Sequence, residues 1–407
     1  MNSSAKRRKK NLKRPKTLKN RSVLLGVSGG VAAYKTVDLV RRLKDEEAAV
    51  TVVMTGAAAN FVTPLSLEVA SQNRVYSSLF EEPLAHIRLP SEADVILIAP
   101  ATANIISKFA NGIADDLLTT CLLSFTGKVI IAPSMNWRMY ENPVIRENLE
   151  KIASLGVIQT GPEKGSLACG EEGMGRMSDV PDILDAVKGA LAEKDLAGEK
   201  IVVTAGPTRE YLDPVRFISN RSSGKMGHAI AAAARDRGAK VTLISGPSSL
   251  RKPGGMDFVQ AETSEEMLEA VRKEVGSGAT VLVMAAAVAD FVPAEKSGTK
   301  TGKEGELCLK LRPAVDIISA VSSSGKRPFI IGFSAETGSH VDRAREKMKS
   351  KHMDMVVFND VTEPGSGFDV DTNRVVIIDK KRETALDLMS KDSVAGAILD
   401  RLLEIKA

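Results

Sequence analysis

Apolar runs of strand length recur along the chain, and segments with helical spacing separate them. In the first half these runs are residues 22–28, 50–54, 94–100 and 128–134. Between the first two, residues 30–44 place Ala33, Val37, Val40 and Leu43 three or four positions apart, the spacing of an amphipathic helix. Strands that alternate with helices predict a parallel sheet covered by helices on both faces.

The same alternation begins again with the apolar run 200–206 and a helical segment at 227–238. The runs that follow are residues 239–245, 279–285, 328–334 and 354–358, then a β-ribbon near 375–379 and a last helix at 391–405. A chain of 407 residues is also too long for one typical core. We therefore expect two doubly wound α/β domains, a flavodoxin-like one at 22–194 and a Rossmann-like one at 195–407.

Basic residues are concentrated at the amino terminus. Residues 1–21 contain ten Lys or Arg and no acidic residue, so the rest of the chain carries −5 although the whole chain carries +5. This segment is predicted to be a disordered basic tail, which either solubilises the chain or contacts nucleic acid or an anionic surface. The net acidic remainder and the aromatic content of 4% disfavour a nucleic-acid-binding protein.

Apolar runs and cysteines indicate in which cellular compartment the protein is expected. No run approaches the roughly 18 apolar residues of a transmembrane helix, so no membrane partner is expected. Cys121, Cys169 and Cys308 lack metal-ligand spacing and cannot all form disulfides with one another. Reduced thiols are typical of a cytoplasmic protein.

The end of the first strand is a candidate phosphate site. Ser28, Gly29 and Gly30 lie between a strand and a helix, where backbone N–H groups could hold a phosphate. The G-x-G-x-x-G pattern is absent and the second strand ends in Thr55 rather than an acid, which disfavours NAD. The pattern is compatible with a mononucleotide such as FMN and also with a purely structural turn.

Two later strand ends carry further polar side chains. Residues 100–116 could hydrogen-bond a flavin ring, or could simply begin a helix capped at Thr102. Residues 133–140 repeat the pattern, with Asn136 as a neutral group able to hold a carboxylate.

A histidine and a cysteine complete the candidates in the first half. His86 could act as a base or hydrogen-bond donor near neutral pH, or could be a surface or capping residue. Cys169 lies in the glycine-rich stretch 165–177, which could fold over a ligand, and this setting favours a functional cysteine over a structural one.

Six motifs of the first half occur in the order found in the flavin-containing cysteine decarboxylases. They are S-G-G-V-A-A-Y-K, H-I-x-L, P-A-T-A-N, A-N-G-x-A-D-D, P-x-M-N-x-x-M and A-C-G-x-x-G-x-G-R-M. The first half resembles the phosphopantothenoylcysteine decarboxylases of this family, which implies an FMN cofactor and a homo-oligomer of trimers assembled into a dodecamer. The resemblance implies FMN contacts at Ser28, Gly29, Gly30, Thr55, Pro100, Ala101, Thr102 and Asn104. It also implies that Asn136 binds the departing carboxylate, His86 acts at the oxidation step and Cys169 donates a proton.

In the second half, the stretch S-N-R-S-S-G-K-M-G at 219–227 is not a standard phosphate loop. It fails the G-x-x-x-x-G-K-[ST] pattern at two positions. Ser222, Ser223 and Gly224 nevertheless precede a helix, so they could hold a phosphate at its positive end or only cap it.

The motifs of the second half occur in the order of the phosphopantothenate–cysteine ligases. They are G-P-T-R-E-Y-L-D-P-V-R-F-I-S-N-R-S-S-G-K-M-G, A-A-A-V-A-D-F, A-E-K, G-F-S-A-E-T and the lysine-bearing segment that ends in F-N-D. With the first half, the resemblance covers residues 22–405 and is to the family of bifunctional coenzyme A biosynthesis proteins. It implies CTP-dependent ligation of L-cysteine to 4′-phosphopantothenate with Mg²⁺, followed by decarboxylation to 4′-phosphopantetheine.

The resemblance also implies residues of the ligase site. Asn220 is expected to hold an acyl-cytidylate intermediate. Nucleotide contacts are expected at Asp290, Lys296, Val315, Asp316, Ile317, Ile318, Phe333, Lys347 and Lys351. It assigns no metal ligand.

One stretch departs from the ligase pattern. The family shows A-E-K-I-K-K and K-N-P-D-I, whereas this chain has A-E-K-S-G-T-K and L-R-P-A-V-D-I-I. The sequence is therefore compatible with either CTP or ATP as the nucleotide. It is also compatible with a protein in which only one half is active, or with a non-catalytic flavoprotein regulatory subunit. The presence of both His86 and Cys169 disfavours the regulatory subunit.

Overall fold

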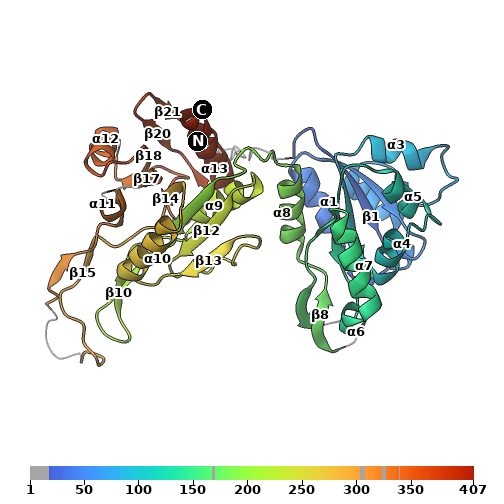
Figure 1. Cartoon of the computed structure of the whole chain (residues 1–407), viewed down its shortest axis with the longest axis horizontal. Coiled ribbons are helices and arrows are strands. Elements are labelled where there is room, and N and C mark those ends of the chain that lie inside the picture. The colour runs from blue at the N-terminus through green and yellow to red at the C-terminus, as the bar shows by residue number, and fades with distance from the viewer. Residues whose placement is uncertain (1–17, 167–169, 303–307, 323–326, 339) are drawn as a thin grey trace, which may run out of the picture. The chain divides into compact units, whose positions relative to one another are not determined.

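The computed structural model describes residues 18–166, 170–302, 308–322, 327–338 and 340–407. They form two compact units that divide between Ala192 and Glu193, each built on its own sheet (Figure 1). Among the described residues, no helix is long and apolar enough to cross a membrane.

The predicted basic tail lies mostly outside the described residues, and its expected boundary needs correction. Residues 1–17 are not described. Leu18, however, is 1% exposed and belongs to the core of the N-terminal unit. Arg21 pairs with Asp94, their nearest charged atoms being 3.3 Å apart. Ordered chain therefore begins before residue 22.

The N-terminal unit contains a six-stranded parallel sheet in the order β3-β2-β1-β4-β5-β6. The strands are β1 (Ser22–Val27), β2 (Ala49–Met54), β3 (Val75–Tyr76), β4 (Val95–Ala101), β5 (Lys128–Pro133) and β6 (Ile158–Gln159). A separate hairpin consists of β7 (Glu163–Ser166) and β8 (Glu172–Arg176).

Helices bury both faces of this sheet. One face packs against α1 (Thr36–Asp45), α2 (Pro64–Ser71) and α8 (Val180–Leu191). The other face packs against α3 (Ala85–Ser91), α4 (Ala103–Ala110), α5 (Leu117–Ser124) and α7 (Pro143–Ser154). The short helices are η1 (Val31–Lys35), η2 (Ala58–Asn60) and α6 (Trp137–Glu141). Val23 and Leu25 of β1 lie in the first core and Leu24 in the second, because successive strand side chains point to opposite faces.

The C-terminal unit contains an eight-stranded sheet in the order β13-β12-β9-β14-β17-β18-β20-β21. The strands are β9 (Lys200–Ala205), β12 (Lys240–Ser245), β13 (Asp257–Gln260), β14 (Val281–Met284), β17 (Phe329–Glu336), β18 (Met355–Asp360), β20 (Val376–Asp379) and β21 (Glu383–Ala385). All pairs are parallel except those of β18 with β20 and β20 with β21. Three two-stranded ribbons pair β10 (Arg209–Tyr211) with β11 (Phe217–Ser219), β15 (Phe291–Pro293) with β16 (Leu311–Pro313), and β19 (Thr372–Asn373) with β22 (Met389–Ser390).

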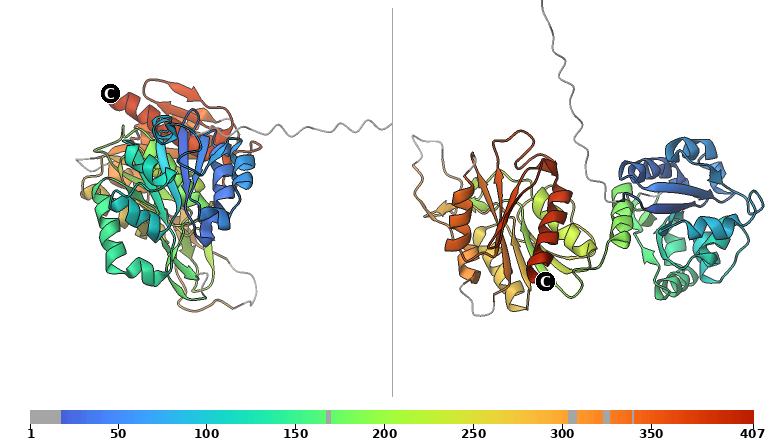
Figure 2. Two further views of the ribbon diagram at one scale, coloured as in Figure 1. Left: turned by 90° about the vertical axis from the view of Figure 1, so that its right-hand side faces the viewer. Right: turned by 90° about the horizontal axis from the view of Figure 1, so that it is seen from above.

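Helices also cover both faces of the second sheet, as Figure 2 shows. On one face, α9 (Lys225–Asp236) and α13 (Lys391–Lys406) share a core with the strands. On the other face, α10 (Ser264–Gly276), α11 (Ile317–Ser322) and α12 (Val341–Ser350) share the second core.

The expected class of two doubly wound α/β sheets is confirmed. In both units the parallel strands follow the 3-2-1-4-5-6 order of dinucleotide-binding folds. The flavodoxin-like description of the N-terminal unit gave its layers correctly, but its connectivity is not the flavodoxin order 2-1-3-4-5. The helix predicted over 30–44 begins as the separate turn η1, and the short ribbons were not predicted because they lack a long apolar run.

Candidate active sites

Each sheet has one point where the strand order reverses, between β1 and β4 in the N-terminal unit and between β9 and β14 in the C-terminal unit. Chains leave these neighbouring strands toward opposite faces, which opens a crevice at their carboxyl ends. Ser28 and Thr102 follow the two strands at this point in the N-terminal unit, and Asp290 follows β14 in the C-terminal unit.

Ser28 joins the ends of β1 and β4. Its side chain is buried, and its hydroxyl donates a hydrogen bond to the Pro100 carbonyl at 2.7 Å. The same oxygen accepts one from the Thr102 backbone N–H at 3.2 Å. Ser28 therefore fixes the spacing of two loops that were predicted to contact FMN.

Among the described residues, Thr55 has an unpaired hydroxyl, and packing against Ala57 and Thr102 leaves little room for a side chain at Gly29 and Gly30. The Thr55 hydroxyl oxygen is buried and has no hydrogen-bond partner among the described residues. A Cβ atom added to Gly29 would lie 2.5 Å from Ala57 Cβ, and one added to Gly30 would lie 3.2 Å from Thr102 Cγ2. An orphaned hydroxyl beside a side-chain-free turn is compatible with a bound mononucleotide, which would supply the missing partner.

The remaining predicted flavin contacts lie at the end of β4 and in the first residues after it. Pro100 and Ala101 are buried, whereas Thr102 is the N-cap residue of α4 and Asn104 is exposed in its first turn. The Thr102 side chain does not cap the helix, because it contacts the Ser28 hydroxyl at 3.0 Å instead. The structure therefore does not contain the alternative that the sequence left open, a helix capped by the Thr102 side chain.

Asn136 lies under the β7–β8 hairpin. Its side-chain oxygen accepts a hydrogen bond from the Arg138 N–H at 2.9 Å, and its amide nitrogen lies 3.5 Å from a Glu171 carboxylate oxygen. Glu171 also accepts hydrogen bonds from the Trp137 indole and the Arg138 guanidinium, each at 2.8 Å. The hairpin that carries Glu171 is thus held directly over the predicted carboxylate-binding residue, a contact for which the sequence contains no signal.

The other two catalytic candidates of the first half are His86 and Cys169. His86 lies in α3, where its backbone carbonyl accepts a hydrogen bond from the Ser124 hydroxyl at 2.6 Å. Cys169 lies outside the described residues, between the two strands of the hairpin.

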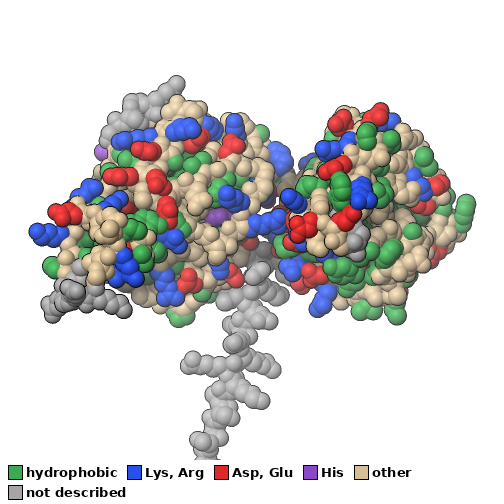
Figure 3. All heavy atoms as spheres, turned by 90° about the horizontal axis from the view of Figure 1, so that it is seen from below, with side chains coloured by type: hydrophobic (Ala, Val, Ile, Leu, Met, Phe, Trp, Pro, Cys, Tyr) green, Lys and Arg blue, Asp and Glu red, His purple; other side chains and the backbone are tan. Residues whose placement is uncertain are grey.

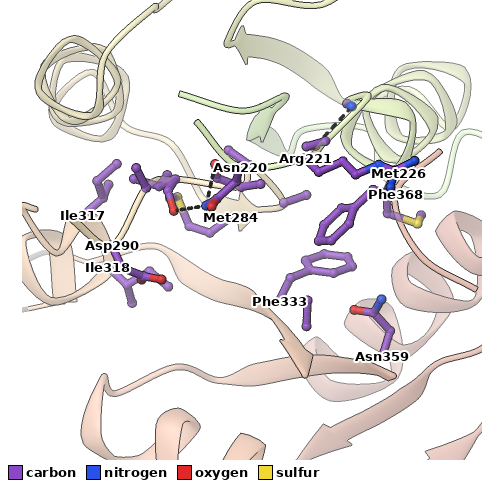
Figure 4. Close-up of a pocket in the computed structure, with 18 of the residues that line it drawn as sticks. Asn220, Arg221, Met226, Met284, Asp290, Ile317, Ile318, Phe333, Asn359 and Phe368 are labelled. Carbon is purple, nitrogen blue, oxygen red and sulfur yellow. Dashed lines mark hydrogen bonds between the residues drawn. The ribbon is translucent and has the colours of Figure 1, made fainter. Parts of the chain in front are cut away.

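The C-terminal unit contains a cavity of about 520 Å³ at the carboxyl ends of β14, β17 and β18. Figure 4 shows Asn220, Asp290 and Phe333 arranged around it. The expected ligase residues that line it are Asn220, Asp290, Val315, Asp316, Ile317, Ile318, Phe333, Lys347 and Lys351. Lys296 is the exception, because it is exposed in the loop after β15 and is not part of the lining.

Lys347 in α12 and Lys351 at the C-terminal end of this helix both line the cavity, but their charged neighbours differ. Lys351 pairs with Asp316 at 2.9 Å, whereas the Lys347 ammonium lies 3.4 Å from the Phe333 carbonyl. Burial, followed by the nearby Lys351 charge, lowers the pKa of Lys347, and Glu336, Asp290 and Asp316 oppose this shift. Burial raises the pKa of Asp316, but hydrogen bonds from Lys351 and Ser319 outweigh burial, so the net shift is downward. The site therefore combines one paired lysine with one half-buried lysine that is suited to an anionic ligand.

Asn220 is held in one orientation by the backbone of the neighbouring loop. Its amide nitrogen donates to the carbonyls of Val288 at 2.8 Å and Ala287 at 3.4 Å (Figure 4). Its side-chain oxygen makes no hydrogen bond to a described residue, so it remains an acceptor for a ligand at the cavity.

Sequence analysis missed part of the lining. The missed residues include Arg221, Lys225, Met226, Ala285–Ala289, Asn359, Phe368, Asn373 and Lys391. Ser222, Ser223 and Gly224, considered as a phosphate cradle, do line the cavity. The described residues contain no group of three or more His, Cys, Asp or Glu arranged to hold a metal ion.

Comparisons with known proteins identify both halves. Residues 11–192 match the family described as "Flavoprotein", and residues 196–405 match the "DNA/pantothenate metabolism flavoprotein C-terminal domain". The chain is 43% identical over 397 residues to the "Coenzyme A biosynthesis bifunctional protein CoaBC" of Bacillus subtilis (strain 168), covering 95% of this chain and 97% of that protein. The protein of the same name from Vibrio cholerae serotype O1 is 41% identical over 396 residues, covering 95% of this chain and 99% of that protein.

The chain belongs to the family of bifunctional coenzyme A biosynthesis proteins.

Members of this family are bifunctional enzymes, and the chain contains both halves. The N-terminal unit is the flavoprotein decarboxylase half and the C-terminal unit is the ligase half. A solved structure, the "C-terminal Domain of Coenzyme A biosynthesis bifunctional protein CoaBC", is 36% identical with a TM-score of 0.45, covering 52% of this chain and 98% of that one. Because both halves match, a non-catalytic regulatory flavoprotein is disfavoured.

Proposed function

We propose that the C-terminal cavity is where L-cysteine is joined to 4′-phosphopantothenate, with CTP as co-substrate. The observation that supports this most is that a single cavity collects Asn220, Asp290, Lys347 and Lys351, which come from separate segments of the unit. A cavity of about 520 Å³ is also within the size range of small-molecule sites.

The proposed chemistry begins with activation of a carboxylate, which is a poor acyl donor to an amine at neutral pH. Attack of the carboxylate oxygen on the α-phosphorus of CTP forms an acyl cytidylate and releases pyrophosphate. The cysteine amine then attacks the acyl carbon, forms the amide and releases CMP. Lys347 and Lys351 would stabilise the negative charge on the phosphoryl oxygens.

Asn220 and the carboxylates of the cavity would orient these groups. The Asn220 side-chain oxygen would accept a hydrogen bond from the acyl intermediate, since its amide nitrogen is occupied by Val288 and Ala287. Mg²⁺ is expected to arrive with the nucleotide, because Mg²⁺ binds phosphates together with one or two carboxylates. Asp290 is the favoured carboxylate, since Asp316 already pairs with Lys351.

For the N-terminal unit we propose FMN as the cofactor, held by Ser28, Gly29, Gly30, Thr55, Pro100, Ala101, Thr102 and Asn104. The buried Thr55 hydroxyl without a described partner supports this assignment. When bound, FMN accepts and returns a hydride, which allows the thiol-bearing part of the substrate to stabilise the electrons left by loss of carbon dioxide.

The residues around the hairpin would handle the substrate carboxylate and protons. The Asn136 amide nitrogen already faces the Glu171 carboxylate, which a substrate carboxylate would replace. His86 would act in the oxidation step and Cys169 would donate the proton that completes 4′-phosphopantetheine.

A mass-spectrometric assay tests the ligase assignment. The purified protein is incubated with 4′-phosphopantothenate, L-cysteine, Mg²⁺ and either CTP or ATP. We expect 4′-phosphopantetheine to form faster with CTP, and Lys347→Met to slow ligation at least about a hundredfold, since charge stabilisation in a buried site is lost. Lys380→Met, at an exposed lysine outside this cavity, is the matched control. Normal ligation by Lys347→Met would refute the proposed site.

We also propose a homo-oligomer, trimers assembled into a dodecamer, that acts in the cytoplasm. Large apolar side chains remain exposed in the N-terminal unit, including Leu65, Val69, Phe80, Leu84 and Ile87, and Figure 3 shows apolar side chains gathered on this unit. Such surface is typical of an interaction site. Cys121 and Cys308 are unpaired, which fits a reducing compartment. Light scattering after size-exclusion chromatography measures the number of subunits. A monomeric protein would contradict the proposed homo-oligomer.

A further inference from the structure

Lys391 is a buried lysine that lines the ligase cavity at the start of α13. Its residue is 6% exposed, and its ammonium nitrogen lies 2.6 Å from the Val370 carbonyl, 3.0 Å from that of Gly367 and 3.3 Å from that of Phe368. An ammonium group has three N–H donors and no acceptor. All three donors are therefore satisfied by one short segment, residues 367–370.

The same segment is held from its other side by the turn that precedes α9. The Ser223 hydroxyl donates to the Phe368 carbonyl at 2.5 Å, and the Lys225 ammonium donates to the Asp369 carbonyl at 3.0 Å. The Arg221 guanidinium pairs with the Asp369 carboxylate at 2.7 Å. Residues 367–370 thus lie between the turn 221–225 and Lys391.

This arrangement determines part of the cavity wall. Gly367 and Phe368 line the cavity together with Arg221 and Lys225. The rings of Phe368 and Phe333 both project into it (Figure 4). Because Phe368 is in a loop rather than in the sheet, its position depends on the contacts that its backbone makes.

We propose that Lys391 is a positioning residue of the ligase site, which holds residues 367–370 so that Phe368 forms one wall of the cavity. Lys391 acts through this segment and not by touching the reacting atoms. The inference rests on the proposal that the cavity is the ligase site.

The charge of Lys391 makes the contact sensitive to alkaline pH. Burial, followed by the Lys225 charge, lowers the pKa of Lys391 to about 8, while the carboxylates of Asp371 and Asp369 oppose the shift. Above this pH the neutral amine has two N–H donors for three carbonyls, and its hydrogen bonds lose their charge assistance. The hydrogen bonds between Lys391 and residues 367–370 should therefore weaken as pH rises through this range.

Hydrogen exchange of the full-length protein tests the positioning role directly. Lys391→Met keeps the side-chain length but removes all three donors, and Lys380→Met again serves as the control. The hydrogen-bonded N–H groups of Ser366 and Arg374 flank the segment. At pH 7 we expect Lys391→Met to raise exchange in peptides that cover residues 366–374 by about tenfold, since hydrogen bonds from a charged donor contribute about 1.5–3 kcal/mol. Exchange in β12 should stay unchanged. Equal exchange at 366–374 in Lys391→Met and wild type would overturn the proposal.

The wild-type protein provides a second measurement if Lys391→Met fails to fold. Protection of residues 366–374 relative to β12, corrected for intrinsic exchange rates, should fall between pH 7 and pH 9. Constant relative protection would overturn the proposal. Lys391→Arg, which stays charged over this range, should lose this pH dependence if it folds.

Ligase kinetics connect the segment to the site. Lys391→Met should raise the KM for the nucleotide or for 4′-phosphopantothenate by about tenfold to a hundredfold, as expected when charge-assisted hydrogen bonds are lost. The decarboxylase activity of the same preparation should not change. Unchanged KM values, with Lys347→Met inactive, would refute the role of Lys391 while leaving the cavity assignment intact. Normal ligation by both variants would refute the cavity assignment itself.

Discussion

Thr55 follows the end of β2 with a buried hydroxyl that has no hydrogen-bond partner among the described residues. Leaving a buried polar group unpaired is unfavourable, and a ligand that supplies the partner relieves this penalty. The Thr55 hydroxyl is therefore expected to be unfavourable in the ligand-free protein and favourable when a ligand is bound.

Thr55→Val should weaken flavin binding without destabilising the N-terminal unit. Valine keeps the shape and removes only the orphaned hydroxyl. We expect the flavin dissociation constant to rise about fivefold, which corresponds to the roughly 1 kcal/mol of one hydrogen bond, with an unchanged or higher melting temperature of the flavin-free protein. Flavin fluorescence titration and calorimetry measure the two quantities.

Thr120→Val is the matched control. Its hydroxyl donates to the Asp116 carbonyl at 2.7 Å, so its removal should lower stability and leave flavin affinity unchanged. If Thr55→Val binds flavin normally, Thr55 does not contact the cofactor.

At the scale of secondary-structure elements, the β7–β8 hairpin depends on close backbone approach. Met135 donates its N–H to the Gly175 carbonyl at 3.0 Å, and a Cβ atom added to Gly175 would lie 2.1 Å from the Met135 carbonyl oxygen. A backbone oxygen cannot move aside as a flexible side chain can, so any larger residue at this position must displace the hairpin from the loop that carries Asn136.

Gly175→Ala should therefore reduce decarboxylation strongly and leave ligation unchanged. The hairpin carries Glu171, and its displacement would change the surroundings of Asn136. We expect at least a tenfold lower decarboxylation rate, since about 1 Å of misplacement near a reacting group can cost about a hundredfold. Separate assays of the two reactions measure this. Gly165→Ala in the same hairpin would meet only the flexible Arg176 side chain at 3.3 Å, so it should be nearly normal. A normal decarboxylation rate in Gly175→Ala would show that the hairpin does not position the site.

At the scale of the whole molecule, the two units bury separate cores. Within the C-terminal unit, α13 is fixed to β20 by Arg401, whose guanidinium contacts the Asp379 carboxylate at 2.7 Å with both side chains buried. Burial raises the pKa of Asp379, but hydrogen bonds from Arg401 and from the N–H groups of Lys381 and Arg382 outweigh burial and lower it. An ionised Asp379 thus contributes stability above its unfolded pKa, and this contribution is lost as pH falls through its folded pKa.

Arg401→Met should destabilise one unit only. Removing one partner of a buried ion pair costs about 3 kcal/mol, so near pH 7 calorimetry should show two transitions of which only that of the ligase unit shifts downward. The difference from wild type should shrink as pH falls through the lowered folded pKa of Asp379, because a protonated Asp379 no longer needs the Arg401 charge. Flavin binding should not change. A shift of both transitions would show that the units unfold together.

The sequence determined the number of domains, their class and the strands after which functional side chains lie. These are local properties, because apolar periodicity along a segment selects strand or helix, and Gly, Ser and Asn at strand ends mark turns at the binding edge. Ser28 and Asn136 could therefore be selected before any contact was known, whereas Asn220 and Phe333 were selected from the family motifs alone.

Only the tertiary structure decided which of these side chains meet and what holds them. It leaves Lys296 outside the cavity and brings in Lys391, which is 171 positions after Asn220 in the printed sequence and is surrounded by an ordinary helix pattern. It places Glu171 against Asn136 and leaves the Thr55 hydroxyl without a described partner. Burial and hydrogen bonding between distant segments depend on how the layers pack, and no local pattern of residues encodes the distance between two atoms on different segments.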